Sequence, residues 1–176
     1  IYGHTNGVGS VREALTAAVE IGVKYLTLYA FSSENWNRPK DEISALMDLL
    51  VQSIYNEVDE LNNKGVKLAT IGDVHFLPAS CQKALYEAKE STKNNSKITL
   101  ILALSYSSRR EISLAVQKMT KEVINGELDL KAINEDLISS YLSTSNYPDP
   151  ELLIRTSGEN RVSNFLMWQL AYTELY

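Results

Sequence analysis

The chain has 176 residues, of which 44% are hydrophobic and 22% are charged. This composition is typical of one globular domain, and a chain of this length buries roughly 70% of its unfolded surface without disulfides or metals. One cysteine and two histidines argue against a disulfide scaffold and a structural zinc cluster, and the net charge of −5 argues against general nucleic-acid binding.

No segment predicts a membrane span or a secretory signal. The most apolar stretch, residues 98–104, has about a third of the roughly 20 residues that cross a bilayer. Residues 1–10 have neither a basic start nor an apolar run, so we expect a cytoplasmic protein. The chain begins at Ile1 without a methionine and stops at Tyr176 within a segment typical of a helix, which leads us to expect a fragment or a trimmed chain.

Helical and extended segments alternate in the first part of the chain. Ser10 and Glu13 form a Ser-x-x-Glu capping box, which predicts that a helix begins there and ends near Gly22. Residues 24–31 are rich in β-branched and aromatic side chains and predict a buried strand, followed by a polar loop over residues 32–40. The next predicted elements are a long amphipathic helix (41–64), a strand (66–71), a helix (78–93) and a strand (97–104).

The same alternation continues in the second part. Ser108 with Glu111 is another capping box and predicts a helix to about Asn125. Ser163 is placed to cap a final helix. Between them we predict a short helix (135–142), a turn (146–150) and a strand (152–156).

Strands separated by helices indicate an α/β fold, here a single domain with a mostly parallel sheet flanked by helices. Ligands of such sheets bind beyond the carboxyl ends of the strands. This rule selects the loops that follow Phe31, Ile71, Leu104 and Thr156.

Two of these loops, residues 31–39 and 154–164, are rich in hydroxyl, amide and arginine side chains. Arginine fits phosphate oxygens with a planar fork, and helix N-termini favour anions. We therefore predict a diphosphate site built from Arg38, Arg155, Arg161 and Ser163, and a further anion site at residues 3–7.

Several of these residues also have a purely structural interpretation. Trp36 is typical of a packing residue, Asn35 of a turn, Arg38 of a solvated loop, and Ser163 of a helix cap. His4 alone is more often structural than catalytic. The chain has no dinucleotide fingerprint, no Gly-rich phosphate loop and no Gly-x-Ser-x-Gly motif.

Phe31–Pro39 (FSSENWNRP) and Arg155–Gln169 (RTSGENRVSNFLMWQ) resemble the two sequence signatures of the cis-prenyltransferase family, and most closely those of its bacterial undecaprenyl diphosphate synthases, or isoprenyl transferases. Gly3-His4, Leu26–Ala30 and Ala171–Tyr176 agree as well, so the resemblance extends over essentially the whole chain.

The resemblance implies repeated condensation of isopentenyl diphosphate onto an allylic diphosphate such as farnesyl diphosphate, with cis double bonds. The implied product is a long-chain polyprenyl diphosphate, undecaprenyl diphosphate, for the lipid carrier of cell-wall synthesis. The resemblance also implies Mg²⁺, a homodimer and a six-stranded parallel sheet with a hydrophobic tunnel. A peripheral membrane contact during product release is compatible with it.

The resemblance also assigns roles to individual residues. Arg155, Arg161 and Ser163 match positions that hold isopentenyl diphosphate, and Glu174 matches a magnesium-binding glutamate. Asn35 matches the position assigned as proton acceptor, although a neutral amide barely accepts protons, so we expect it to orient a substrate or a diphosphate oxygen. Other substrate-binding positions are matched by His4, Ser32, Ser33, Glu34, Trp36 and Arg38. Candidates for the tunnel lining, which are equally typical of an ordinary core, are Leu28, Ala30, Leu46, Leu50, Ile98, Leu100 and Leu102.

The chain departs from the family pattern at four places. The family's Asp-Gly-Asn-Gly-Arg-Trp motif, with its magnesium aspartate, is absent and would precede Ile1, and the C-terminal segment expected after Tyr176 is missing too. Residues 105–109 read Ser-Tyr-Ser-Ser-Arg instead of Asn-Tyr-Gly-Gly-Arg, and Asn160 replaces a histidine found in many members. Without the aspartate motif the chain alone is expected to be inactive. The first interpretation is an active cis-prenyltransferase seen here without its ends. Two alternatives stay open: a catalytically silent partner subunit of the same fold, and an unrelated anion-binding α/β protein.

Overall fold

The computed structural model describes residues 2–156 and 158–176, with side chains from residue 9 onward. These residues form two compact units, 1–105 and 106–176. The first contains α1 (Tyr2–Glu20), β1 (Tyr25–Ser32), the 3-10 helix η1 (Ser33–Asn37), α2 (Lys40–Asn63), β2 (Val66–Ile71), η2 (Val74–Phe76), α3 (Ala79–Thr92) and β3 (Ile98–Tyr106). The second contains α4 (Ser108–Ile124), η3 (Leu130–Ala132), α5 (Glu135–Tyr141), β4 (Leu152–Leu153) and β5 (Glu174–Leu175).

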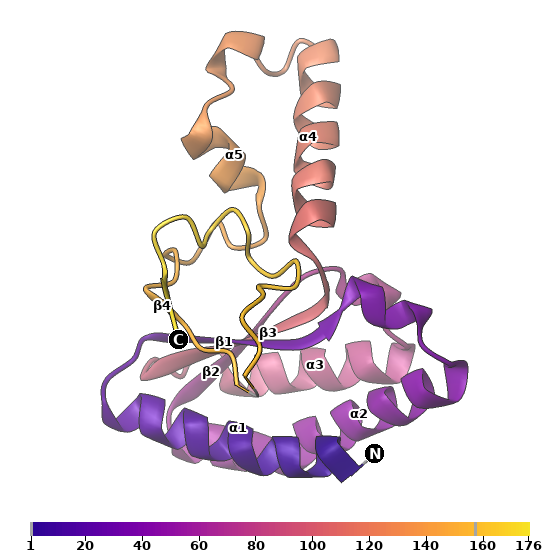
Figure 1. Ribbon diagram of the computed structural model, residues 1–176, viewed down its shortest axis with the longest axis vertical. Helices are drawn as coiled ribbons and strands as arrows, with labels where there is room; N and C mark the ends of the chain where they lie inside the picture. Colours follow the sequence, from indigo (N-terminus) through magenta and orange to yellow (C-terminus); the bar gives the residue numbers. More distant parts are fainter. Residues whose placement is uncertain (1, 157) are drawn as a thin grey trace. The chain divides into compact units, whose positions relative to one another are not determined.

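The first unit is a small sheet covered by helices on one side (Figure 1). Its strands lie in the order β1-β3-β2, and β2 pairs with β3 in parallel from Val66–Ile98 to Ile71–Ala103. Helix α2 packs against α3, and both contact β2. The fold therefore has the parallel α/β character that the sequence predicts.

Helix α2 agrees well with its prediction. Its apolar residues recur at intervals of three and four, and Met47, Ile54 and Leu61 are buried in the core. The helix ends before Gly65, whose φ of 70° lies in the left-handed region that glycine adopts without strain.

Helix α1 begins earlier than predicted. It starts at Tyr2, so Ser10 and Glu13 lie inside the helix and their capping box is not used as an end. Residues 3–7, predicted as an anion-binding loop before the helix, belong to α1 itself, and their side chains lie outside the described residues.

The second unit is built around the α4–α5 pair, whose contact buries Ala115, Met119 and Leu142. Asn134 caps α5, because its side-chain oxygen accepts a hydrogen bond from the backbone N–H of Leu137 at 2.8 Å. Strand β4 pairs in parallel with β5, with Leu152 opposite Glu174.

Two predictions for the second unit are wrong. Ser107, not Ser108, is the residue before α4, while Ser108 Oγ is buried and accepts a hydrogen bond from the backbone N–H of Met167 at 3.0 Å. The described residues after 157 contain no helix, because Ser163 and Asn164 have φ values of 50° and 61°, which no α-helix accommodates.

The six-stranded sheet is also a wrong expectation. In the ranges that the structure describes, there is one three-stranded sheet and one two-stranded sheet. The strand predicted over residues 152–156 is only two residues long, and it pairs with β5 instead of extending the larger sheet. None of the helices in the described ranges has the length and apolar character that crossing a bilayer requires.

Candidate functional site

An apolar cavity of about 470 Å³ lies within the first unit, among α1, α2 and the sheet. Leucine is the most frequent residue in its wall. Most of the predicted tunnel residues line it, namely Leu28, Ala30, Leu46, Leu50, Leu100 and Leu102. Ile98 does not line the cavity: it is almost fully buried in the core.

The polar turn η1 follows β1 directly, and two residues line the cavity here: Asn35 of the turn and Arg38, which comes directly after it. The side-chain oxygen of Asn35 accepts a hydrogen bond from the backbone N–H of Ser32 at 2.9 Å. The backbone N–H of Arg38 donates to the carbonyl oxygen of Asn35 at 3.1 Å. The turn is therefore closed by its own hydrogen bonds, and it holds an amide and a cation at one part of the cavity wall.

Arg38 is half exposed and pairs with Glu42 one helical turn later, with an Nη1–Oε1 distance of 2.6 Å. Such an exposed pair contributes little to stability. A bound anion can therefore compete for this guanidinium at small cost.

Trp36 is a packing residue in this structure. Its ring meets the ring of Phe31 edge-on, with 4.9 Å between the centroids, and its Nε1 donates a hydrogen bond to Ser105 Oγ at 2.9 Å. The structural interpretation of Trp36 is thus confirmed, and its substrate-binding role stays a prediction. Sequence reasoning missed Ser105, although its departure from the family's asparagine marked the position.

Tyr29 is a second lining residue that sequence reasoning missed. Burial raises the pKa of Tyr29 to about 12, the charge of Glu34 acts in the same direction, and a hydrogen bond with Ser32 opposes them. Glu34 also accepts a hydrogen bond from Ser33 Oγ at 3.3 Å. The Tyr29 hydroxyl therefore stays protonated at neutral pH.

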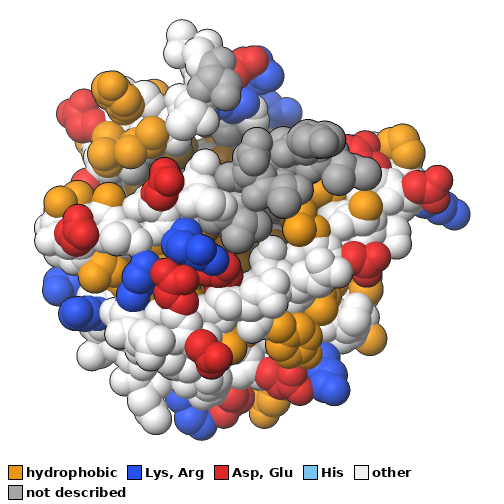
Figure 2. Space-filling view, turned by 90° about the horizontal axis from the view of Figure 1, so that it is seen from below, with side chains coloured by type: hydrophobic (Ala, Val, Ile, Leu, Met, Phe, Trp, Pro, Cys, Tyr) orange, Lys and Arg blue, Asp and Glu red, His pale blue; other side chains and the backbone are white. Residues whose placement is uncertain are grey.

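Charged side chains line the cavity near the C-terminal end of α2. Arg12 of α1 pairs with Glu57 and Glu60, and Lys64 Nζ bonds Glu60 and Thr16 Oγ1, each at 2.7 Å. Acidic and basic side chains lie next to one another over the faces of α1 and α2 (Figure 2). At about 1.5 Å per residue, Glu57 lies roughly 25 Å along α2 from Lys40, so this network and η1 contribute to opposite ends of the cavity.

The second unit gathers three of the predicted diphosphate ligands. Arg155 Nη1 donates to Ser163 Oγ at 2.7 Å and to the backbone carbonyl oxygen of Arg161. The Arg161 guanidinium pairs with Glu159. Arg155, Arg161 and Ser163 thus form one cluster, which we call the arginine cluster, whereas Arg38 belongs to the first unit. The predicted helix N-terminus makes no contribution, because no helix begins at Ser163.

Two predicted site residues, Glu174 and His4, have no described contact with another predicted site residue. Glu174 lies in β5 and is exposed, and the part of the chain that the structure describes has no cluster of three His, Cys, Asp or Glu residues able to hold a metal. Mg²⁺ commonly uses one or two carboxylates together with substrate phosphates, so a single carboxylate such as Glu174 is compatible with it. The side chain of His4 lies outside the described residues.

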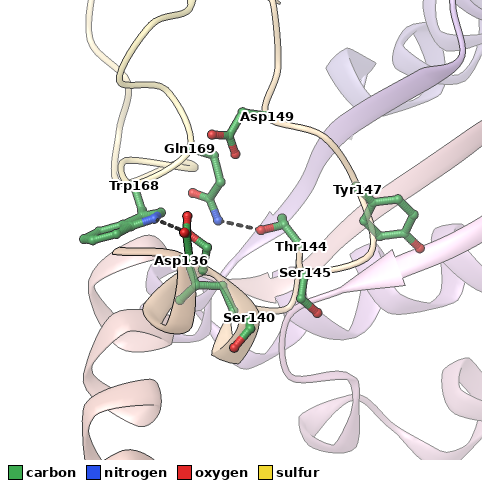
Figure 3. A pocket seen from close by; sticks show the side chains of 10 residues that line it. Asp136, Ser140, Thr144, Ser145, Tyr147, Asp149, Trp168 and Gln169 are labelled. Carbon is green, nitrogen blue, oxygen red and sulfur yellow. Dashed lines mark hydrogen bonds between the residues drawn. The ribbon is translucent and has the colours of Figure 1, made fainter. Parts of the chain in front are cut away.

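A small polar pocket of about 200 Å³ lies in the second unit (Figure 3). On its wall, Trp168 Nε1 donates to Ser139 Oγ at 3.0 Å and Gln169 Nε2 donates to Thr144 Oγ1 at 2.9 Å. None of the predicted site residues lines this pocket.

The family model described as putative undecaprenyl diphosphate synthase matches residues 1–176. The chain belongs to this family. It is 51% identical over 174 residues to an isoprenyl transferase of Clostridium tetani, covering 99% of the chain and 68% of that relative. It is also 51% identical over 174 residues to the Micrococcus luteus ditrans,polycis-undecaprenyl-diphosphate synthase ((2E,6E)-farnesyl-diphosphate specific), covering 99% of the chain and 70% of that protein.

Solved structures of relatives have the same fold. Lavandulyl diphosphate synthase from Lavandula x intermedia, in complex with dimethylallyl diphosphate, superimposes with a TM-score of 0.95 at 35% identity, over 99% of this chain and 76% of that one. A probable undecaprenyl diphosphate synthase from Campylobacter jejuni gives a TM-score of 0.85 at 32% identity, over 97% and 79% of the two chains. These similarities exclude the unrelated anion-binding protein that the sequence alone left open.

Proposed function

We propose that this protein is a cis-prenyltransferase that condenses isopentenyl diphosphate onto farnesyl diphosphate and lengthens it to undecaprenyl diphosphate. The observation that carries this proposal is the apolar cavity of the first unit, with Asn35 and Arg38 in its wall, in a chain that matches the undecaprenyl diphosphate synthase family over its whole length.

In the proposed reaction, the double bond of isopentenyl diphosphate forms a carbon–carbon bond with the first carbon of the allylic substrate. The allylic carbon–oxygen bond breaks, diphosphate leaves with the electron pair, and a proton is lost to give the new cis double bond. Positive charge develops on the allyl group while negative charge grows on the leaving diphosphate. The apolar walls keep water away from the cation, and fixed positive charges stabilise the leaving group.

The arginine cluster is the proposed site for the diphosphate of isopentenyl diphosphate. Two hydrogen bonds orient the Arg155 guanidinium, so little conformational freedom remains to be lost on binding. Arg161 now pairs with the exposed carboxylate of Glu159, and a doubly charged diphosphate is a stronger partner for the same guanidinium. Ser163 Oγ adds a hydroxyl donor to the set.

The η1 turn is the proposed site for the reacting end of the allylic substrate. Arg38 supplies a positive charge in the cavity wall, and Ser32, Ser33, Glu34, Trp36 and His4 belong to this proposal because they match the family's positions. Because Asn35 Oδ1 already accepts the Ser32 N–H, the amide NH₂ group is left to donate to a diphosphate oxygen. We therefore assign Asn35 an orienting role and leave the proton to a diphosphate oxygen.

Magnesium is part of the same proposal. Glu174 would hold the ion together with diphosphate oxygens, and the ion would neutralise charge on the leaving group. A homodimer, a cytoplasmic location, a peripheral membrane contact for product release and a role in supplying the cell-wall lipid carrier complete the proposal, and each needs its own test.

The experiment that tests this function is incubation of the full-length protein with labelled isopentenyl diphosphate, farnesyl diphosphate and Mg²⁺, followed by sizing of the products. We expect a long-chain polyprenyl diphosphate. Product formation only after a second, related subunit is added would instead identify a silent partner subunit, and no product under either condition would refute the proposal.

A further inference from the structure

Ser105 has a backbone conformation that serine seldom adopts. It lies near the end of β3 with φ = 48°, in the left-handed region where a Cβ is sterically unfavourable. Its side chain is buried. Glycine would meet the backbone requirement without strain, so the presence of a serine points to a use for its hydroxyl group.

That use is a hydrogen bond to the η1 turn. Trp36 Nε1 donates to Ser105 Oγ at 2.9 Å, although the two residues are 69 positions apart in the sequence. The Trp36 ring is also held edge-on against Phe31. In a partly buried setting with little competing water, such a bond fixes an indole more strongly than it would at the surface.

Trp36 is the neighbour of Asn35 and lies two residues before Arg38. The Asn35–Ser32 bond closes the turn locally, and the Trp36–Ser105 bond is a side-chain hydrogen bond that joins the turn to β3. We propose that Ser105 is a positioning residue, which holds Asn35 and Arg38 at the cavity through the indole of Trp36. This inference rests on the proposed function of the η1 turn, and it concerns a position where the family pattern has asparagine.

Ser105→Gly separates this role from a purely structural one. Glycine removes the hydroxyl and leaves the Trp36 N–H without this partner, but it also relieves the backbone strain, so the two effects on the melting temperature oppose each other and the net change should be small. If Ser105 positions the turn, kcat should nevertheless fall about tenfold, because small displacements of catalytic groups are costly. The KM for isopentenyl diphosphate should stay the same, because the proposed site for that substrate is the arginine cluster.

Ser105→Asn is the conservative variant. Asparagine tolerates the left-handed region and offers a side-chain oxygen to the indole, so it should retain most of kcat. Trp36→Phe removes the donor and keeps an aromatic ring against Phe31, and it should lower kcat by a similar factor. The double variant Ser105→Gly/Trp36→Phe should be no slower than either single variant, since both remove the same bond.

Trp168→Phe is the matched control, because it removes another indole–serine bond, from Trp168 to Ser139, within the second unit. It should leave kcat unchanged. In the 176-residue chain the same substitution leaves Trp36 as the one tryptophan, so the fluorescence of this chain reports the Trp36–Ser105 bond, here called the tether, without turnover. Adding Ser105→Gly in this background should shift the Trp36 emission.

These outcomes distinguish the tether from the proposed function. If the wild-type protein makes no polyprenyl product but Ser105→Gly still shifts the Trp36 emission in the Trp168→Phe background, the function is refuted and the tether stays in place. A fully active Ser105→Gly protein, or unchanged Trp36 emission, would overturn the positioning role. A loss of kcat in Ser105→Gly that is accompanied by an equal loss in the Trp168→Phe control would overturn it as well.

Discussion

The side-chain oxygen of Asn35 accepts a hydrogen bond from the backbone N–H of Ser32 at 2.9 Å. This contact fixes the amide at the start of the η1 turn and places it in the wall of the apolar cavity. A neutral amide is a very weak base and is poorly suited to take a proton from a substrate, and this oxygen already accepts one hydrogen bond. The geometry therefore favours an orienting role for Asn35.

Replacement of Asn35 by alanine should impair turnover more than binding. Losing both the Ser32 contact and the amide donor should lower kcat by about 100-fold, with a small change in the KM for isopentenyl diphosphate. Asn35→Asp keeps an acceptor for the Ser32 N–H but lacks the NH₂ group, so it should be impaired too. Steady-state kinetics measure both, and a normal kcat in Asn35→Ala would remove this residue from the mechanism.

Arg155→Ala and Arg161→Ala should each raise the KM for isopentenyl diphosphate by at least about tenfold, since each removes charge-assisted hydrogen bonds to a diphosphate. Arg155→Lys should recover only part of the loss, because an ammonium lacks the planar fork. Arg110→Ala, an exposed arginine on α4, is the control. Unchanged kinetics in both alanine variants would refute the arginine cluster as a diphosphate site.

Filling the cavity should shorten the product. Leu102→Phe adds volume to the wall contributed by β3, so elongation should stop at least one isoprene unit earlier. Leu114→Phe makes the same change at an exposed position on α4 and should leave the product unaltered. Chromatographic sizing of the polyprenyl products checks both, and equal product lengths would indicate that the growing chain does not occupy this cavity.

The network that joins α1 to α2 should make stability depend on pH. The Lys64 hydrogen bond, aided by the charges of Lys64 and Arg12, lowers the pKa of Glu60 below its ordinary value of 4.5, although burial opposes this. A lowered folded-state pKa gives a contribution that is present above the unfolded-state pKa and is lost as pH falls through the folded-state pKa.

Arg12→Met should therefore lower the melting temperature slightly at neutral pH and reduce the loss of stability between neutral pH and pH 3. Lys83→Met, which breaks the exposed Lys83–Glu87 pair on α3, is the matched control and should change the pH profile less. Melting curves over this pH range measure the effect, and identical profiles for Arg12→Met and the wild type would contradict the assigned role of the network.

Chelation should abolish activity. EDTA is expected to stop product formation, and added Mg²⁺ should restore it. Glu174→Gln should raise the Mg²⁺ concentration needed for half-maximal rate, since an amide is a weaker ligand for this ion. Full activity in EDTA would exclude the metal, whereas an unchanged Mg²⁺ requirement in the variant would exclude Glu174 as its ligand.

The elements that could be predicted from the sequence are those set by local pattern. The three- and four-residue spacing of apolar residues located α2, the apolar run at 97–104 located β3, and the left-handed Gly65 marked a helix end. Most of the tunnel candidates line the apolar cavity, which was predictable because the period of a strand and of a helix decides which side chains share a face.

Contacts between distant residues account for most of the errors. Glu111 could have capped α4, but it instead accepts hydrogen bonds from Tyr106 and from the backbone N–H of Ser143. The predicted final helix is prevented by the backbone at Ser163, and the Trp36–Ser105 bond joins positions that no local pattern connects. At these positions the contacts and backbone conformation of the folded chain decide the structure, and the local sequence pattern does not.

The most direct test of the account is a crystal structure of the full-length protein with farnesyl thiodiphosphate, a slowly reacting analogue of the proposed allylic substrate. We predict that the hydrocarbon lies in the apolar cavity against Leu28, Leu50 and Leu100, with the diphosphate toward Arg38 and Asn35. A hydrocarbon bound elsewhere, with this cavity closed by packed side chains, would contradict the account.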